Sequence, residues 1–100
     1  MIIVSGTLRL LPDDLAALRD VARATIEATR AESGCIVYSF ADDLTEPGLV
    51  RIYEEWEDRA SLEAHGNTAH IATWREALAR VKAQGAQLQL IEIASAEPFS

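Results

Sequence analysis

Two stripes of apolar residues at helical spacing most strongly limit what this 100-residue chain can fold into. Within each stripe, an apolar or small side chain returns every three or four residues, which places them all on one face of an α-helix. The first stripe consists of Leu15, Leu18, Ala22, Ile26 and Thr29, and the second of Ile71, Trp74, Leu78 and Val81. Segments rich in β-branched residues precede, separate and follow the stripes, so the chain must combine helices with strands.

Turn-forming and capping residues predict the limits of these elements. Pro12 favours the start of the first helix, with two carboxylates in its first turn, and Gly34 favours its end. Asn67 or Thr68 is expected to cap the helix that carries the second stripe, and Gly85 to close it. The expected strands cover residues 2–10, 35–41, 49–57 and 87–94, with a short extra helix over 59–65.

The resulting order of elements, β-α-β-β-α-β, is that of the ferredoxin-like fold. We therefore expect an α+β protein in which residues 1–100 form a single domain, with a four-stranded antiparallel sheet and its helices on one face. Apolar residues occupy both faces of the expected strands, with Tyr38 and Phe40 on one face and Val37 and Ala41 on the other. Because a bare apolar face is unfavourable in water, we predict a homodimer in which two sheets pack face to face.

The charge and the cysteine content exclude several classes of function. Nine basic residues against 16 acidic ones give a net charge of −7, which disfavours binding to nucleic acid or to an anionic membrane surface. The sequence has no apolar run of the ~18 residues that a membrane span needs, and no signal-peptide pattern. Cys35 is the only cysteine, which excludes an internal disulfide and a cysteine-rich zinc site. We expect a cytoplasmic protein.

Glu54 is a candidate general base. It shares one face of the third expected strand with Ile52 and Trp56, and burial between them would raise the pKa of its carboxyl group. The alternative is that Glu54 lies solvated at the end of the sheet or pairs with a nearby arginine.

His65 and His70 are the only histidines and lie on either side of the expected helix break at Gly66 and Asn67. Metalloprotease-type zinc sites need two histidines four residues apart on one continuous helix and a third ligand, so we expect no metal site. A loop between two short helices can open onto a pocket, which makes both histidines candidates for catalysis. Taken singly, a histidine at a helix end is more often a hydrogen-bonding group than a catalyst, and Asn67 is explained as a helix cap.

Three aromatic residues are candidate contacts for a small ligand. Trp74 lies in the second apolar stripe, which favours a place in the core. Trp56 stands at a strand end, where it can also form the wall of a pocket. Tyr38 is the third candidate.

Residues 32–70 contain a pattern that resembles the antibiotic biosynthesis monooxygenase family of small dimeric α/β-barrel proteins, which includes quinol monooxygenases. The pattern is E-x-G-C, a tyrosine three residues later, E-x-W, a histidine nine residues after the tryptophan and another five residues further on. The matching residues are Glu32, Gly34, Cys35, Tyr38, Glu54, Trp56, His65 and His70. Haem degraders in this superfamily have an axial histidine where this chain has Arg75, so we expect no haem and no other cofactor.

The resemblance implies a ligand pocket between the sheet and the helices that brings Trp56, His65, His70 and Trp74 together. It also implies that a quinol or polyhydroxylated aromatic is oxidised by O₂ without a cofactor. Such a reaction requires a base, a hydrogen-bond donor for the developing oxyanion and a dry cavity.

We expect His65 to act as the base, His70 or Asn67 as the oxyanion donor, and Glu54 to orient a histidine or share its proton. The expected catalytic residues are thus His65, His70, Glu54 and Asn67, and the expected substrate-binding residues are Trp56, Trp74 and Tyr38.

Two other functions stay open at the level of the sequence. One is an isomerase of a small carbonyl compound or phospho-sugar, in which Arg51, Arg59 or Arg75 would bind an anionic group. The other is a dimeric module that binds a small aromatic ligand without catalysis.

Overall fold

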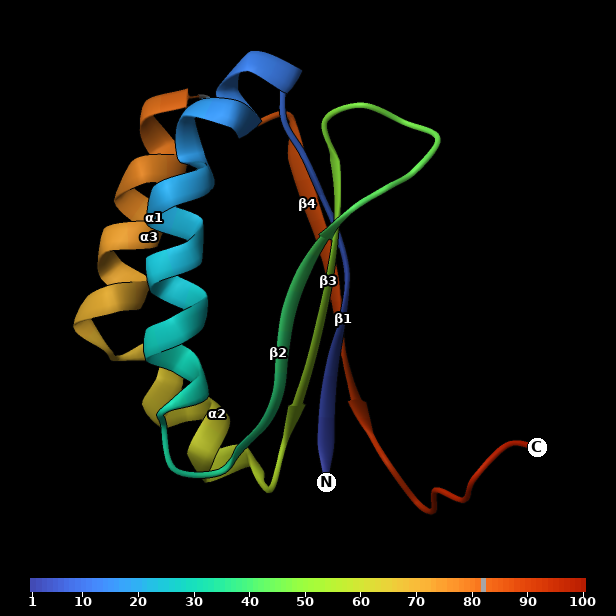
Figure 1. Ribbon diagram of the computed structural model, residues 1–100. Coiled ribbons are helices and arrows are strands. Elements are labelled where there is room, and N and C mark those ends of the chain that lie inside the picture. Colours follow the sequence, from blue (N-terminus) through green and yellow to red (C-terminus); the bar gives the residue numbers. More distant parts are fainter. Residues whose placement is uncertain (82) are drawn as a thin grey trace.

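The computed structural model describes residues 1–81 and 83–100 as a four-stranded sheet with helices packed against one side of it (Figure 1). This arrangement confirms the predicted α+β, ferredoxin-like class, with the second helical region divided in two. In chain order, the elements are β1 (Ile2–Arg9), α1 (Pro12–Arg30), β2 (Cys35–Asp42), β3 (Leu49–Trp56), α2 (Arg59–Gly66), α3 (Ala69–Val81) and β4 (Gly85–Glu92).

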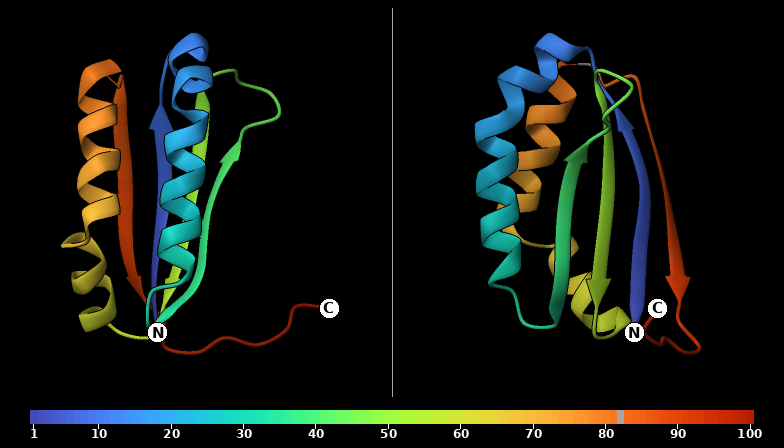
Figure 2. Two further views of the ribbon diagram at one scale, coloured as in Figure 1. Left: turned by 60° about the vertical axis from the view of Figure 1, so that its left-hand side comes forward. Right: turned by 45° about the vertical axis from the view of Figure 1, so that its right-hand side comes forward.

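The strands run in the order β2-β3-β1-β4, and each neighbouring pair is antiparallel. Helices α1 and α3 lie side by side over one face of this sheet and leave the opposite face open (Figure 2). The register places Ile2 opposite Trp56 and Val4 opposite Glu54. Glu54 and Trp56 therefore lie at the end of the sheet from which the chain continues into α2.

Apolar side chains between the sheet and the helices form two neighbouring clusters. The larger one includes Leu18 of α1, Val50 of β3 and Trp74 of α3. The smaller one consists of Ile2, Tyr38 and Trp56, and it is called the Trp56 cluster below. Phe40 packs against both clusters and joins them into a continuous core.

Of the two residues predicted to cap the second helical region, Thr68 caps α3 and Asn67 caps the end of α2 instead. Asn67 caps the end of α2, and its side chain donates to the carbonyl of Glu63 at 3.2 Å. Thr68 begins α3, because its hydroxyl oxygen accepts from the backbone N–H of Ile71 at 3.4 Å. The same hydroxyl donates to the carbonyl of His65 at 2.8 Å, which ties the end of α2 to the start of α3.

Two strand details also differ from the prediction. Gly85 opens β4 instead of closing α3, and its φ of 144° is a conformation that glycine adopts readily. The pairing of β2 with β3 is irregular between Cys35 and Val37. Period-two alternation would place these two residues on the same face of β2, but the irregularity turns Cys35 toward the Trp56 cluster.

β4 is exposed along its whole length. Leu88 and Leu90 are 48% and 43% exposed, and Ile91, which points to the other face, is 41% exposed. The register places Ile91 opposite Ile3 on the open face, whereas Leu88 and Leu90 lie opposite Gly6 and Val4 on the helix side. The homodimer stays a prediction, and of these three side chains a face-to-face pairing of sheets would cover Ile91. Within the described residues, the helices are all too short or too polar to cross a membrane.

Candidate functional site

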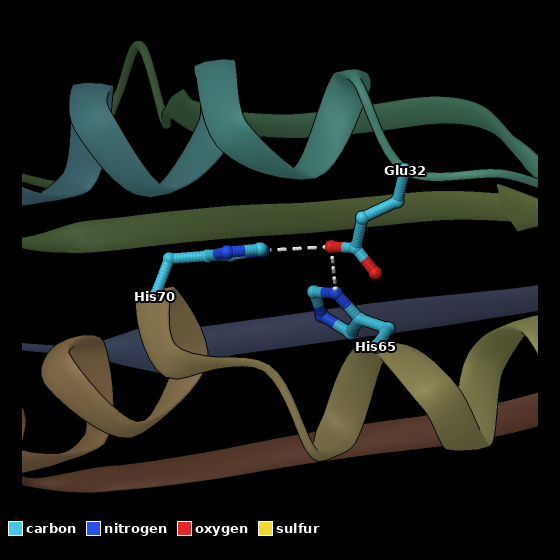
Figure 3. A group of neighbouring side chains, drawn as sticks. All are labelled: Glu32, His65 and His70. Carbon is cyan, nitrogen blue, oxygen red and sulfur yellow. Dashed lines mark hydrogen bonds and ion pairs between the residues drawn. The ribbon is translucent and has the colours of Figure 1, made fainter.

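The Glu32 carboxylate holds both histidines of the chain (Figure 3). Nδ1 of His65 lies 2.8 Å from Oε2 of Glu32, and Nε2 of His70 lies 2.7 Å from the same oxygen. Glu32 stands in the turn between α1 and β2, His65 in the last turn of α2 and His70 in the first turn of α3. Three separate segments therefore converge on one carboxylate oxygen.

Local backbone features position these three segments. The turn after α1 bends back at Gly34, whose φ of +83° favours glycine, and Gly34 lies directly against Ser61 of α2. Asp58 caps α2 by accepting from the backbone N–H of Ser61 at 2.8 Å. The turn that carries Glu32 is thus packed against the first turn of the helix that carries His65.

The hydrogen bonds define which nitrogen of each imidazole carries a proton. An ionised carboxylate only accepts hydrogen bonds, so Nδ1 of His65 and Nε2 of His70 must both donate to Glu32. A neutral imidazole then keeps its second nitrogen as an acceptor. That acceptor is Nε2 in His65 and Nδ1 in His70, and a basic nitrogen of this kind can remove a proton from a ligand.

Burial differs among the three side chains. His65 is 7% exposed and Glu32 14%, whereas His70 is 24% exposed. A hydrogen bond in such surroundings is stronger than one in water. His70 is the member of the group that solvent or a small molecule reaches most readily.

Aromatic rings surround His65. Its ring centroid lies 4.8 Å from that of Trp56 and 5.2 Å from that of Tyr38. Burial raises the pKa of the Tyr38 phenol, and the charges of Glu54 and Glu32 raise it further. Tyr38 therefore stays protonated at neutral pH and presents an O–H group rather than a phenolate.

Glu54 is buried beneath the histidines, as the alternation of β3 predicts. Its Oε1 accepts a 3.0 Å hydrogen bond from the indole N–H of Trp56. Burial raises the pKa of the Glu54 carboxyl group, while the Trp56 hydrogen bond and the nearby His65 act in the opposite direction. Glu32, and not Glu54, makes the hydrogen bonds that the structure shows to the two histidines. That Glu54 orients a histidine or shares its proton stays a prediction.

The arginines that were alternative partners for Glu54 interact elsewhere. Arg51 pairs with Asp43 at 3.1 Å, and Arg59 pairs with Glu92 at 2.7 Å. Arg75 donates to the carbonyl of Gly66 at 3.2 Å.

Two predicted site residues lie apart from the histidines. The Trp74 ring packs on Phe40, with centroids 5.5 Å apart, and belongs to the larger core cluster. Asn67 is exposed and caps α2. The structure therefore brings His65, His70, Tyr38, Trp56 and Glu54 together, but not Trp74 and Asn67.

A pocket of about 340 Å³ lies between α1 and the sheet, next to the Trp56 cluster. This volume is at the lower end of the range typical of small-molecule sites. Its apolar lining is Leu8, Leu10, Leu15, Ala22, Ile26, Phe40, Val50 and Trp74, and its polar lining is Arg19, Arg23, Glu27, Arg30 and Asp42.

Ile26 and Phe40 separate this pocket from the histidines. Both line the pocket, and both also pack against the Trp56 cluster. The Phe40 ring lies between those of Trp74 and Tyr38, with centroid distances of 5.5 and 5.2 Å. A row of rings thus runs from the pocket wall to Tyr38, which in turn contacts His65.

Glu32 is the functional candidate to which the sequence interpretation gave no role. The spacing of the two histidines, five residues apart across a helix break, argued against a metal site of the metalloprotease type, which also needs a third ligand. The structure supplies one, since donor atoms of Glu32, His65 and His70 all lie within 4.8 Å of one another. The E-x-G-C pattern was the only sequence signal for Glu32, and it names no partner.

Comparison with proteins of known sequence and structure gives the relatives of this chain. The chain is 31% identical over 96 residues to the uncharacterised protein sll1783 of Synechocystis sp. This match covers 96% of the chain but only 65% of sll1783. It is 26% identical over 70 residues to YcnE of Bacillus subtilis, named as a proposed monooxygenase, covering 70% of this chain and 74% of YcnE.

Among solved structures, one from Deinococcus radiodurans, described as a proposed antibiotic biosynthesis monooxygenase, superposes with a TM-score of 0.92 at 27% identity. The match covers 100% of this chain and 99% of that one. PA3566 from Pseudomonas aeruginosa superposes with a TM-score of 0.83 at 26% identity, covering 94% of each chain. The family model described as "Antibiotic biosynthesis monooxygenase" matches residues 1–77. The chain belongs to the antibiotic biosynthesis monooxygenase family.

Proposed function

We infer that this chain is a cofactor-independent monooxygenase that oxidises a quinol or another electron-rich hydroxylated aromatic with O₂. The observation that carries this inference is the pair of histidines held on Glu32, with rings of Trp56 and Tyr38 against His65. Such a group offers a base in surroundings with little water, next to an apolar pocket of suitable size.

Glu32 takes the orienting role that the sequence interpretation gave to Glu54. By accepting from Nδ1 of His65, it leaves Nε2 of that ring as the basic nitrogen and stabilises the imidazolium that forms when His65 takes a proton. His70 is held on the same carboxylate oxygen and is more accessible. Once protonated, it can donate a hydrogen bond to an oxyanion on the substrate.

The reaction needs no external reductant. The base removes a phenolic proton, and the resulting anion transfers one electron to O₂, giving a semiquinone-type radical and superoxide. These combine with formation of a C–O bond to a hydroperoxide. Loss of water breaks the O–O bond, so that one oxygen atom stays on the ring as a carbonyl and the other leaves as water.

Entry of the substrate requires a change at the wall between the pocket and the histidines. Ile26 and Phe40 form that wall, and both side chains are only partly buried. Rotation of these side chains would join the pocket to the space beside Tyr38 and His65, since loosely packed side chains change rotamer on a fast timescale.

A proton-transferring isomerase is the second candidate. It would use the same histidine base, and an anionic substrate could be bound by Arg19 and Arg23 at the pocket. The aromatic and aliphatic walls of the pocket favour a ring over a sugar, which places this candidate second.

The test measures O₂ consumption with menadiol or a trihydroxynaphthalene, above the rate of the same solution without protein. The wild-type chain is expected to accelerate uptake, and His65→Ala and Glu32→Gln to reduce the acceleration by about 10²–10⁴-fold. Glu63→Gln, on the exposed side of α2, is the matched control and should retain full activity. Equal rates for the wild-type and His65→Ala proteins, both folded by near-UV circular dichroism, would exclude the proposal.

A further inference from the structure

We propose that Glu32, His65 and His70 form a binding site for a divalent transition-metal ion such as Zn²⁺, and that the ion blocks the histidine base, because coordination at Nδ1 of His65 leaves the proton of that ring on Nε2. The metal site stands on its own geometry, whereas the inhibition rests on the proposed function. Two imidazole nitrogens and one carboxylate oxygen are ligands that Zn²⁺ takes in proteins, with water in the fourth position.

The donor atoms are already close to the arrangement that such an ion needs. Zinc–ligand bonds of about 2.0–2.2 Å at tetrahedral angles place neighbouring donor atoms about 3.3–3.5 Å apart. Here Oε2 of Glu32 lies 2.8 Å from Nδ1 of His65 and 2.7 Å from Nε2 of His70, and all three atoms lie within 4.8 Å of one another. To hold an ion, rotations of the three side chains must lengthen each Glu32–histidine contact by roughly 0.6 Å and bring the two histidine nitrogens, which lie within 4.8 Å of one another, to the same separation.

Metal binding requires no unfavourable protonation state. The nitrogens that face Glu32 now carry protons, and a neutral imidazole can hold its single proton on either nitrogen. Moving that proton to Nε2 of His65 and to Nδ1 of His70 presents a lone pair from each ring to the ion. The two neutral rings and the Glu32 carboxylate then offer one negative charge to a divalent cation.

The surroundings add negative charge and leave one side open. The chain as a whole carries a charge of −7, which attracts cations. His65 and Glu32 are largely covered, whereas His70 is 24% exposed and leaves an approach for the ion and its water ligand.

The donor set also defines which ions should bind. Two imidazole nitrogens favour Zn²⁺, Co²⁺, Ni²⁺ or Cu²⁺, while Mg²⁺ and Ca²⁺ prefer sites made of oxygen atoms. Because the three ligands come from the α1–β2 turn, α2 and α3, the ion would also link these segments. Binding to the folded chain alone would raise its unfolding temperature.

The experiment treats the 100-residue chain with chelator and then titrates it with Co²⁺, followed by its visible absorption bands, and with Zn²⁺, followed by calorimetry. The wild-type chain is expected to bind one ion per chain. Glu32→Gln and His70→Gln should each lower the affinity at least about tenfold, since the loss of even an outer-shell partner costs about 10–100-fold. Glu63→Gln should bind as the wild type does, and circular dichroism checks that each variant is folded.

Absence of Co²⁺ bands and of Zn²⁺ heat with the wild-type chain would overturn the metal site, as would equal affinity in Glu32→Gln. Mg²⁺ in place of Zn²⁺ should give no signal, and tight Mg²⁺ binding at the same residues would also contradict the proposed donor chemistry.

The metal site and the enzymatic function fail separately. Metal binding without any quinol oxidation would support the site and remove the proposed function. Quinol oxidation that persists with chelator and stops at saturating Zn²⁺ is the result expected when both hold. Oxidation that continues at saturating bound Zn²⁺ would overturn the blocking role.

Discussion

The indole Nε1 of Trp56 donates a 3.0 Å hydrogen bond to Oε1 of Glu54, and both side chains are buried. The two residues are neighbours on the inner face of β3, at positions two apart, so the strand itself holds the donor close to the acceptor. This bond stabilises a carboxylate where burial disfavours its charge. Burial outweighs this bond and raises the pKa of Glu54, so its titration couples to folding.

Glu54→Gln should make the stability of the fold less dependent on pH. Burial raises the pKa of Glu54 above its ordinary value of 4.5, so the folded state binds this proton more tightly than the unfolded state does. The resulting stabilisation is fully present below pH 4.5 and is lost as the pH rises through the raised pKa. Relative to the wild type, Glu54→Gln should therefore gain stability as the pH rises, because glutamine carries no charge and still accepts from Trp56.

Urea unfolding between pH 4 and pH 8 measures this difference. Glu57→Gln, at an exposed position just after β3, is the control and should follow the wild-type curve. A stability difference between Glu54→Gln and the wild type that stays constant across the pH range would contradict the assignment.

Gly34→Ala should destabilise the chain more than Gly85→Ala does. Both glycines have positive φ values, of 83° and 144°, but a Cβ at Gly34 would collide with Ser61, whereas a Cβ at Gly85 meets open space. The backbone conformation alone costs about 1–2 kcal/mol for a residue with a side chain. Urea unfolding should show an additional loss for Gly34→Ala, and equal losses at the two positions would show that the Ser61 contact is easily relieved.

The order of elements could be predicted because each depends on residues that are close in sequence. The stripe through Leu15, Leu18 and Ala22 marks α1, and the alternation through Ile52, Glu54 and Trp56 gives the inward face of β3. Boundaries are less local. Gly85 suits both the end of a helix and the start of a strand, and only the chain's return to β1 decides between them.

The candidate site was less predictable, because its defining contacts join distant residues. Glu32 meets His65 and His70 across 33 and 38 positions in the sequence, and no local period reports such a contact. Trp74 was expected beside the histidines, but its ring packs against that of Phe40. Helical spacing predicts the face on which a side chain lies, and not which of the two core clusters it joins.

Ile26→Ala should increase the rate of quinol oxidation by opening the wall between the pocket and the histidines. Ile26 lines the pocket and packs against the Trp56 cluster, so its truncation joins the two spaces. Leu15→Ala enlarges the same pocket without altering that wall and serves as the control. We expect a several-fold gain in kcat/KM for a bicyclic quinol with Ile26→Ala alone, and equal effects of both changes would contradict this route.

Tyr53→Glu should dissociate the predicted homodimer. Tyr53 lies on the open face of the sheet, opposite Ser5 of β1 and Ser39 of β2, and is 38% exposed. The new carboxylate would be buried at the middle of a face-to-face interface without a partner for its charge. Loss of a central aromatic contact costs about 2 kcal/mol or more, so association should weaken at least about tenfold. Light scattering should give the wild type twice the 10.9 kDa mass of one chain, and Tyr53→Glu the mass of one. Leu44→Glu, at a fully exposed position in the β2–β3 loop, should leave the dimer intact. A wild-type chain that is monomeric at micromolar concentration would rule out sheet pairing as the way in which this open face is covered.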